Sequence, residues 1–396
     1  MRRIDPTKAQ AARSSTIRSI NKQMVLNFVR DREPISRAEI SRITELQRST
    51  VSIIIEELVN EGLIEEIGTG DSTGGRRPTM LRLRPEGAMA IGIDIGPTST
   101  TIALCDMVGN IIEREDFTTE TNLKKMQAEI NERILAMKER HKERSIEGVG
   151  ISLPGLVDPA LGKAIYIPYF KWREWNLVEE IKSATGLDAI IDNDANVAAL
   201  AELWFGRPEV SNARDFILVL VSEGIGTGII FDGQVYRGDY SAAGEFGHMI
   251  IGQNSFNPCS CGNVDCWEAF SSNRAAMARY AKNTEIAITF PELIDRALGG
   301  EQAAIDALSE TAHYLGIGIT NLIVGLSPET VVVSGEITRA WSLVAEALKE
   351  PIRRSVRRGL PSSRIVPSTL QDSATLMGAL SLVLARKFSF TPVSGR

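Results

Sequence analysis

Cysteine, histidine and aromatic residues are scarce in this chain: its 396 residues include four cysteines, three histidines and only 6% Phe, Trp and Tyr. Four cysteines cannot frame a chain of this length with disulfides. No apolar run reaches the roughly 18 residues of a membrane-spanning helix. The first residues, 1–5, also lack the apolar stretch of a secretory signal. We therefore expect a cytoplasmic protein without a membrane partner, long enough for two or three domains.

The net charge of −6 hides an asymmetry along the chain. Residues 1–50 hold 11 Lys and Arg against 5 Asp and Glu, whereas the remaining residues hold 33 against 45. A basic N-terminal segment on an acidic body favours a head that meets a polyanion such as DNA and a body that does not.

The basic segment has the periodicity of helices. Apolar residues at helical spacing run over 16–30 and 48–60, and Ser36 caps a shorter helix between them, with Glu39 completing a capping box. Two short helices joined by a four-residue turn, 44–47, predict a helix-turn-helix, whose second helix enters the major groove of DNA.

A β-hairpin is predicted after the third helix. Gly62 ends that helix, and residues 63–67 and 80–83 predict two strands around a glycine-rich tip that carries Arg76 and Arg77. Such a wing suits contacts to the DNA backbone or to a narrow minor groove. The alternative interpretation is a three-helix accessory domain whose basic residues are only solvated.

The N-terminal end of the third helix, which would contact the bases, offers one bidentate donor, Arg48, and several hydroxyl groups. We expect no apolar side chain to face outward there. Such groups suit hydrogen bonds to base edges. The candidate DNA contacts are Arg37, Gln47, Arg48, Ser49, Thr50, Ser52, Arg76 and Arg77.

Beyond residue 87 the sequence alternates strand and helix patterns, which indicates an α/β fold. A long helix is predicted over 123–140, and the strand pattern restarts at Phe216. The small and apolar residues of 374–384 suit a closely packed helix at a lobe junction or a dimer contact. Cys105 lies in an apolar run and is expected to be buried. The strands expected before Phe216 cover residues 90–96, 100–105, 111–114, 148–153 and 189–192.

The other three cysteines gather near a histidine. Cys259, Cys261 and Cys266 lie within eight positions, and His248 precedes them closely. One imidazole and three thiolates form the tetrahedral ligand set of a structural zinc ion, with no open position for catalysis. We expect zinc as the cofactor; the alternative is a fortuitous cluster in a loop.

These motifs resemble the ROK family of repressors and sugar kinases over nearly the whole chain. The matching stretches are Glu61-Gly62-Leu63-Ile64, Gly74-Gly75-Arg76-Arg77-Pro78, Gly224-Ile225-Gly226-Thr227-Gly228, Gly244-Glu245-Phe246-Gly247-His248 and the cysteine cluster. One departure lies in the turn of the head, where relatives usually read Thr-Gly-Leu-Ser and this chain reads Thr44-Glu45-Leu46-Gln47.

The resemblance implies a fold and its division. A winged helix-turn-helix at 1–86 would precede a two-lobed, actin-like sugar-kinase domain of ribonuclease-H-like topology at 87–396. Lobe 1 would cover about 87–195 plus the C-terminal helix, and lobe 2 about 196–372.

A sugar site is also implied by the resemblance. Asn193 and Asp194 match the family's Asn-Asp pair, whose Asp is the general base in the kinases; on its own, the pair could equally be a turn after a strand. His248 would offer one ring nitrogen to zinc and the other to a sugar hydroxyl. Leu156 stands where an Arg often follows the loop glycine in sugar-binding relatives. The implied sugar-binding residues are Gly155, Asn193, Asp194, Glu245, His248 and Glu268.

Three loops that cradle phosphate in the family's kinases differ in this chain. Pro97 removes an N–H where the kinases have Gly, and the Lys that follows there is missing. Glu223 places a carboxylate where phosphate would lie, and Ser334-Gly335-Glu336 stands where the kinases have a Gly-Gly pair. Carboxylates beside a polyphosphate cost on the order of several kcal/mol. We therefore expect no catalytic residues and no phosphotransfer.

The sequence thus predicts a sugar-responsive repressor of carbohydrate-metabolism genes. It would bind double-stranded operator DNA as a homodimer or tetramer, and sugar entering the cleft would close the lobes and reorient the heads. The alternatives are an active ATP-dependent sugar kinase with a DNA-binding head, and a repressor controlled by a protein partner. A phosphosugar effector would need a basic group in the cleft.

Overall fold

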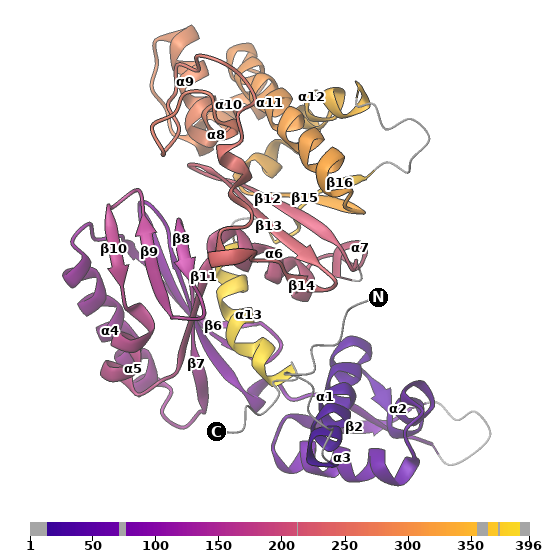
Figure 1. Cartoon of the computed structure of the whole chain (residues 1–396). Helices are drawn as coiled ribbons and strands as arrows, with labels where there is room; N and C mark the ends of the chain where they lie inside the picture. The colour runs from indigo at the N-terminus through magenta and orange to yellow at the C-terminus, as the bar shows by residue number, and fades with distance from the viewer. Residues whose placement is uncertain (1–13, 71–76, 212, 355–362, 371–372, 389–396) are drawn as a thin grey trace.

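The computed structural model describes residues 14–70, 77–211, 213–354, 363–370 and 373–388 (Figure 1). Its N-terminal part holds three helices and a three-stranded antiparallel sheet of order β1-β3-β2. The elements are α1 (Ser14–Arg32), β1 (Ile35–Ser36), α2 (Arg37–Thr44), α3 (Arg48–Asn60), β2 (Ile64–Thr69) and β3 (Thr79–Leu83). The expected helices and the two strands of the hairpin are therefore confirmed, whereas β1 was not predicted. Arg76 and the glycines of the hairpin tip lie outside the described residues.

The turn between α2 and α3 shows what the two unusual residues do. Glu45 takes the left-handed conformation, with φ 57°, where a glycine would bear no steric cost. Gln47 precedes α3 without a side-chain cap, although Ser36 caps α2 through a 3.2 Å hydrogen bond from the Glu39 amide. The Glu39 carboxylate lies 3.7 Å from Arg42, so the predicted capping box forms only in part.

The end of α3 follows the sequence closely. Gly62 is left-handed, with φ 73°. The Gly62 and Leu63 amides donate to the carbonyls of Val59 and Leu58, both at 2.9 Å. This pair of bonds is a Schellman motif, and the buried Leu63 side chain completes it.

The body contains two five-stranded sheets with the same topology. If the strands of each sheet are numbered in chain order, both sheets read 3-2-1-4-5, with antiparallel pairs on one side of the first strand and parallel pairs on the other. The first sheet comprises β4 (Met89–Ile95), β5 (Ser99–Asp106), β6 (Ile111–Thr118), β7 (Ile146–Leu153) and β11 (Ala189–Asn193). The second comprises β12 (Phe216–Val221), β13 (Ile225–Phe231), β14 (Gln234–Val235), β15 (Thr330–Ser334) and β16 (Arg364–Pro367). The expected α/β pattern and its restart at Phe216 are confirmed.

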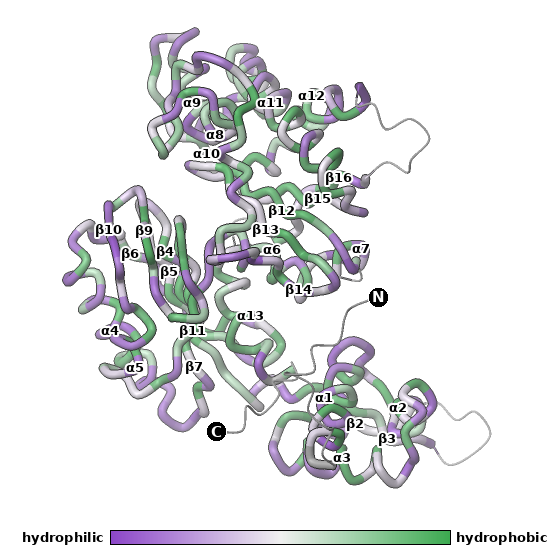
Figure 2. The backbone as a smooth tube through the Cα atoms, viewed as in Figure 1, coloured by the Kyte–Doolittle hydropathy of each residue, from purple (hydrophilic) through white to green (hydrophobic). Residues whose placement is uncertain are grey.

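Helices cover both sheets, and the strands between them are apolar (Figure 2). The first sheet packs against α4 (Leu123–Arg140) and α5 (Leu177–Thr185). Beside the second sheet lie α8 (Trp267–Ser271), α9 (Asn273–Thr284), α10 (Phe290–Leu298), α11 (Gln302–Leu326) and α12 (Trp341–Arg354). Short elements, α7 (Pro208–Ser211) and the 3-10 helices 85–87, 239–241, 245–248 and 336–340, join them. None of the described helices is both long and apolar enough to span a bilayer.

A small antiparallel sheet that the sequence analysis did not predict follows β7. It comprises β8 (Leu156–Asp158), β9 (Lys163–Ile167) and β10 (Trp172–Trp175). Trp172 and Trp175 are buried, and their indole nitrogens donate to the Thr121 carbonyl and to the Gln127 side chain, both at 2.8 Å. These two tryptophans therefore pack the fold, whereas Tyr169 between β9 and β10 lines a pocket.

Two helices, α6 (Asp194–Phe205) and α13 (Ala374–Phe388), lie between the sheets and touch at backbone distance (Figure 1). A Cβ atom added to Gly378 of α13 would lie 1.9 Å from the Val197 carbonyl oxygen of α6. On the other side of α13, a Cβ on Gly150 of β7 would lie 1.8 Å from the Ala379 carbonyl oxygen. The small residues of the C-terminal helix thus pack at a junction between the two halves.

The same two helices reach the N-terminal part. The Arg30 guanidinium of α1 lies over the rings of Trp204 (4.4 Å) and Phe388 (5.0 Å), near the ends of α6 and α13. The Asn27 side chain donates a 2.9 Å hydrogen bond to the Phe388 carbonyl. Phe388 belongs to the apolar core of the N-terminal part, so the N-terminal part packs directly against the body.

Substituting Gly378 with alanine tests the close approach of α6 and α13. The added methyl group meets backbone atoms that cannot rotate away, and overpacking of this kind costs about 1–3 kcal/mol. We expect a lower urea midpoint with an unchanged slope. Gly325→Ala is the matched control, because that glycine also lies in a helix but has no atom within 4 Å of an added Cβ. Equal midpoints for the two variants would contradict the packing argument.

Candidate ligand pocket and metal centre

A pocket of about 670 Å³ opens between the two halves of the body. Parallel strands of both sheets end at it: β4 and β7 from the first sheet, β12 and β15 from the second. The carboxyl ends of strands in α/β folds leave polar loops that bind ligands. All six residues proposed for sugar binding line this pocket.

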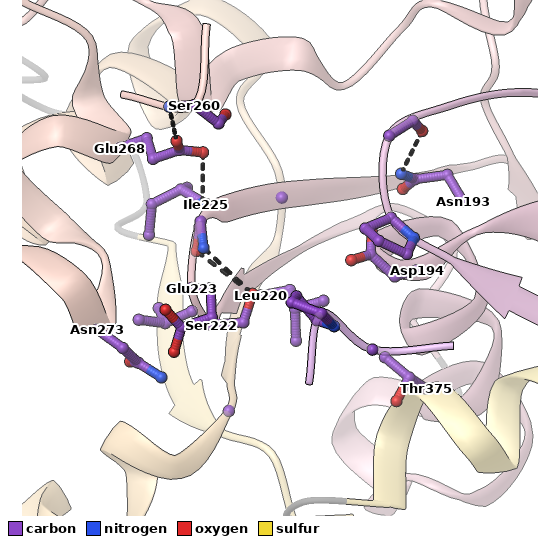
Figure 3. Close-up of a pocket in the computed structure, with 18 of the residues that line it drawn as sticks. Asn193, Asp194, Leu220, Ser222, Glu223, Ile225, Ser260, Glu268, Asn273 and Thr375 are labelled. Carbon is purple, nitrogen blue, oxygen red and sulfur yellow. Dashed lines mark hydrogen bonds between the residues drawn. The ribbon is translucent and has the colours of Figure 1, made fainter. Parts of the chain in front are cut away.

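The Asn193-Asp194 pair lies where β11 runs directly into α6. Asn193 is the N-cap of α6: its side-chain oxygen accepts from the amides of Ala195 (3.0 Å) and Asn196 (3.4 Å). Its side-chain nitrogen donates to the Gly155 carbonyl at 3.0 Å. Asn193 therefore fixes the start of the helix and the neighbouring loop, and Asp194 faces the pocket (Figure 3).

Behind Asn193 and Asp194 lies an ion pair that the sequence did not predict. The buried Asp192 carboxylate receives the Arg237 guanidinium at 2.6 Å and the Asn196 side chain at 3.1 Å. Arg237 comes from the second half of the body, so the ion pair joins the two halves beside the pocket. Nothing in the local sequence around Arg237 indicates this partner, which lies 45 positions away.

Burial changes the acidity of the pocket's carboxyl groups. It raises the pKa of Asp194 to about 7; the negative charges of Asp94 and Glu245 add to this rise, and the hydrogen bond from the Ala195 amide opposes it. Burial likewise raises the pKa values of Asp94 and Glu245. A carboxyl group with a pKa near 7 is partly protonated at neutral pH. Its protonated form both donates and accepts hydrogen bonds, which suits contact with hydroxyl groups.

Glu245, His248 and Glu268 connect the pocket to the cysteine cluster. The His248 Nε2 lies 3.6 Å from the Glu245 carboxylate, while its Nδ1 lies 3.2 Å from the Cys259 Sγ. Glu268 accepts from the Ser260 amide (2.7 Å) and the Ile225 amide (3.3 Å). One histidine therefore faces both sites, and Glu268 ties the cysteine loop to β13.

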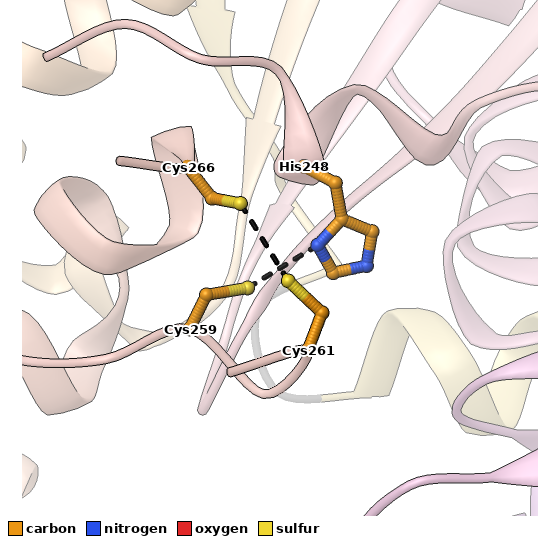
Figure 4. Close-up of side chains that lie close together, drawn as sticks. All are labelled: His248, Cys259, Cys261 and Cys266. Carbon is orange, nitrogen blue, oxygen red and sulfur yellow. Dashed lines mark hydrogen bonds between the residues drawn. The ribbon is translucent and has the colours of Figure 1, made fainter. Parts of the chain in front are cut away.

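The cluster of His248, Cys259, Cys261 and Cys266 could hold a metal ion (Figure 4). One ligand atom from each residue lies within 4.8 Å of the others. The sulfur atoms of Cys261 and Cys266 are 3.7 Å apart. Two sulfurs at about 2.3 Å from a tetrahedral centre would be separated by about 3.8 Å, so the spacing fits. The fourth cysteine, Cys105, is buried in the first sheet as expected.

The three loops singled out for phosphate binding meet at the same pocket. They contribute Pro97, Glu223 and Ser334-Gly335-Glu336, and Figure 3 shows Glu223 facing the pocket interior. Among the described residues that line the pocket there is no Lys or Arg. Burial raises the pKa of Glu223, and the positive charge of Arg274 partly opposes it. The part of the pocket formed by these three loops is therefore acidic, and no described Lys or Arg lines it to bind an anion.

The described candidate DNA contacts come from the start of α2, from the start of α3 and from the residue that follows the hairpin tip. Gln47, Arg48, Ser49 and Arg77 are exposed, and Thr50 and Ser52 are half-buried. Arg37 lies 2.9 Å from Glu66 and 3.8 Å from Glu56, so two carboxylates already engage it.

One expectation about this surface is wrong. Ile53 of α3 is 52% exposed beside the polar residues, although no apolar side chain was expected to face outward. The inward stripe consists of Val51, Ile54, Ile55 and Leu58. Because these four residues occupy the buried face of α3, Ile53 lies on the face that is exposed to solvent.

The raised pKa of Asp194 predicts a pH-dependent stability difference. Between the ordinary value of 3.8 and the folded value of about 7, the folded protein binds more protons than the unfolded chain, so its stability falls as pH rises. Asp194→Asn removes this titration. We expect the variant to exceed the wild type in urea stability by on the order of 4 kcal/mol at pH 8 and by less than half of that at pH 5.

The control for this experiment is Asp188→Asn. Lys182 lowers the pKa of Asp188 through a hydrogen bond, so this substitution should not stabilise the protein at pH 8. An Asp194→Asn advantage that stays constant between pH 5 and pH 8 would show that titration is not its cause.

Comparisons with known proteins identify the family. The ROK family model matches residues 90–386. A putative xylose repressor of Caldicellulosiruptor sp. (strain Rt8B.4) is 34% identical over 94% of this chain and 98% of its own length. The N-acetylglucosamine repressor of Escherichia coli O6:H1 is 28% identical over 95% of each chain.

Two solved structures bear on the arrangement. A ROK family transcriptional regulator, a homologue of the E. coli MLC protein, superposes with a TM-score of 0.80 at 26% identity, covering 94% of this chain and 97% of its own. A ROK glucokinase from Streptomyces griseus, in complex with glucose and AMPPNP, has a TM-score of 0.67 at 26% identity and covers 74% of this chain and 98% of its own. The body thus has the actin-like sugar-kinase fold, and the chain belongs to the ROK family.

Proposed function

We propose that this chain is a sugar-responsive transcriptional repressor of carbohydrate-metabolism genes. The observation that carries the proposal is the path of α6 and α13. Each begins at the pocket, with Asp194 and Thr375, and each ends against α1, with Trp204 and Phe388. A ligand that moves the two halves of the body must therefore move the N-terminal part. The named relatives that match over the full length are repressors.

The N-terminal part would be the DNA-binding domain, a winged helix-turn-helix over residues 1–86, with the ROK domain over 87–396. In the ROK domain, lobe 1 would take about 87–195 plus the C-terminal helix, and lobe 2 about 196–372. In a helix-turn-helix the second helix reads the major groove with its N-terminal residues. Arg48 would make a bidentate contact to guanine, and the exposed Ile53 would contact a thymine methyl group.

The remaining candidate residues would contact either the DNA backbone or the bases. Ser49, Thr50, Ser52 and Gln47 would bond to bases or phosphates near the start of α3, and Arg76 and Arg77 would serve the wing. Arg37 would have to leave its two carboxylates to reach DNA, so its contribution should be smaller.

The effector would be a neutral sugar held by Gly155, Asn193, Asp194, Glu245, His248 and Glu268. Carboxyl and amide groups around a cleft hydrogen-bond a set of ring hydroxyls, and a wrong sugar leaves some of them unpaired. A phosphosugar fits poorly, because no Lys or Arg is among the described residues that line the pocket.

Phosphotransfer is the second candidate function, and Asp194 favours it, since a carboxyl with a pKa near 7 suits a general base. The donor side argues against it. The glucokinase relative holds AMPPNP in its complex, whereas Glu223 and Glu336 would bring negative charge to the triphosphate here. We therefore propose that the domain binds sugar without transferring phosphate, and that Asp194 is a sugar ligand.

A structural zinc ion would be held by His248, Cys259, Cys261 and Cys266. Three thiolates and one imidazole leave no open position, so the ion would supply cross-linking and not catalysis. His248 would orient toward the sugar while bound to the metal.

The repressor would act as a homodimer or tetramer in the cytoplasm. Operators that bind helix-turn-helix proteins are often two half-sites about one helical turn apart, which two heads must reach together. A small rotation of each head is then enough to lose one half-site.

Metal removal tests the zinc assignment. We expect about one zinc per chain by elemental analysis, and a fall of about 5 °C or more in melting temperature after chelation. Cys261→Ala should lose both the metal and the chelator response. Cys105→Ala is the control, because this cysteine is buried away from the cluster; it should keep the zinc. A chelator-insensitive wild type without zinc would refute the assignment.

DNA binding and its release test the function. DNA selected by the full-length, zinc-loaded protein would serve as the operator in fluorescence anisotropy, with xylose, glucose, N-acetylglucosamine, their phosphates and ATP as additions. Arg48→Ala should weaken operator binding tenfold or more, since a bidentate base contact is worth about 1–3 kcal/mol. Arg364→Ala, whose side chain pairs with Glu329 on the second half of the body, should not.

The outcomes separate the alternatives. A change in operator affinity with one free sugar, and none with ATP, would support the repressor. Turnover of ATP would support the kinase, and a protein that binds DNA but responds to no small molecule would support control by a protein partner.

A further inference from the structure

The pocket continues well beyond the six residues proposed to hold a sugar ring. Its volume of about 670 Å³ lies in the middle of the range for drug-sized ligands, about 300–1,000 Å³, and a single pentose or hexose is much smaller. The remaining part is bounded by the ends of β12 and β15 and by the starts of α9 and α10. We call it the second subsite; Glu223, Asn273, Met277, Phe290 and Ser334 line it.

Two polar atoms of the second subsite are buried and have no partner. Asn273 is 7% exposed and its side-chain oxygen makes no hydrogen bond among the described residues. The Ser334 hydroxyl is fully buried and is equally unpartnered. An unmade hydrogen bond of this kind costs about 1–3 kcal/mol, so such atoms point to a ligand. In Figure 3 the Asn273 amide lies on the same wall as the Glu223 carboxylate.

The chemistry of this wall selects the class of ligand. Its polar groups are carboxyl, amide and hydroxyl, and none of the described lining residues offers a positive charge to an anion. Met277, Phe290 and Pro291 add apolar surface next to them. Hydroxyl-binding groups beside apolar side chains match a sugar ring, which has polar edges and apolar faces. Phosphate or a nucleotide does not match.

The second subsite adjoins the first without a barrier. The Arg274 guanidinium donates to the Glu223 carbonyl at 2.9 Å and lies 3.3 Å from the Glu268 carboxylate. Between them, Gly224 runs so close to Glu268 that a Cβ atom there would lie 2.5 Å from its Oε2. The backbone N–H of Asn273 donates to the Ser222 carbonyl at 2.9 Å. The two subsites thus share one loop.

We infer that the effector is a disaccharide, with one ring at Asn193, Asp194 and Glu245 and the second ring against Glu223, Asn273 and Ser334. This inference rests on the proposed function, because it names the ligand class of the same sugar site. The second ring would lie against the side chains that carry the two unpaired atoms, and the wall offers no described Lys or Arg to a phosphate in its place.

Calorimetry with matched pairs of sugars tests this. The full-length, zinc-loaded protein would be titrated with xylose and xylobiose, glucose and cellobiose, and N-acetylglucosamine and its β-1,4 disaccharide. We expect one disaccharide to bind at least tenfold more tightly than its own monosaccharide. AMPPNP is the probe for a retained nucleotide site and should not bind.

Variants locate the second ring. Asn273→Ala and Glu223→Gln should reduce the affinity of the disaccharide about tenfold and leave that of the monosaccharide within twofold. Glu245→Gln, on the first subsite, should weaken both sugars. Each variant is compared by melting temperature without ligand, so that a folding defect is recognised; Ser334→Ala provides a second, smaller truncation of the same wall.

Each outcome decides between the proposals. A monosaccharide that binds as tightly as its disaccharide, with Asn273→Ala and Glu223→Gln silent, overturns the disaccharide and leaves the sugar-responsive repressor standing. Binding of AMPPNP that competes with the disaccharide also overturns it. If no sugar in the panel binds, the disaccharide and the sugar-responsive function both fall.

Discussion

Backbone contact between Gly378 and the Val197 carbonyl determines how the rest of the protein is assembled. Because Gly378 has no side chain at this crossing, α13 packs directly on α6, which contacts strands of both sheets. Thr375 at one end of α13 bonds to Asp94 in the pocket at 2.5 Å, and Phe388 at the other end enters the core of the N-terminal part. Because interiors are densely packed and stiff, these two helices form a continuous packed path from the pocket to the N-terminal part.

Burial, and not any single ion pair, sets the character of the pocket. It raises the pKa values of Asp94, Asp194, Glu223 and Glu245 together. Carboxyl groups that resist ionisation prefer partners that can both donate and accept hydrogen bonds. A hydroxyl group does both without bringing a charge. Burial of these carboxyl groups and the lack of Lys and Arg among the described lining residues therefore both fit the uncharged ligand proposed above.

Local patterns predicted most of the fold, since helix 48–60, the stop at Gly62 and the cysteine spacing depend on neighbours in sequence. The site residues were reached only through the family resemblance, because no spacing relates Asn193 to Glu268. The Asp192–Arg237 ion pair escaped because it joins segments 45 positions apart. The small sheet after β7 and the unpaired Asn273 oxygen escaped because neither leaves a periodicity in the sequence. The exposure of Ile53 escaped for a different reason: a helical stripe marks which residues are buried and only by exclusion which are not.

The shared strand order of the two sheets has an evolutionary consequence. Each half of the body delivers its own loops to the pocket, and the loops that carry Glu223 and Ser334 come from the half that lies farther along the chain from the head. Mutations there alter what is recognised without touching Trp204, Arg30 or Phe388. Substitutions in these loops can therefore change the ligand contacts while the residues that join the body to the N-terminal part stay as they are.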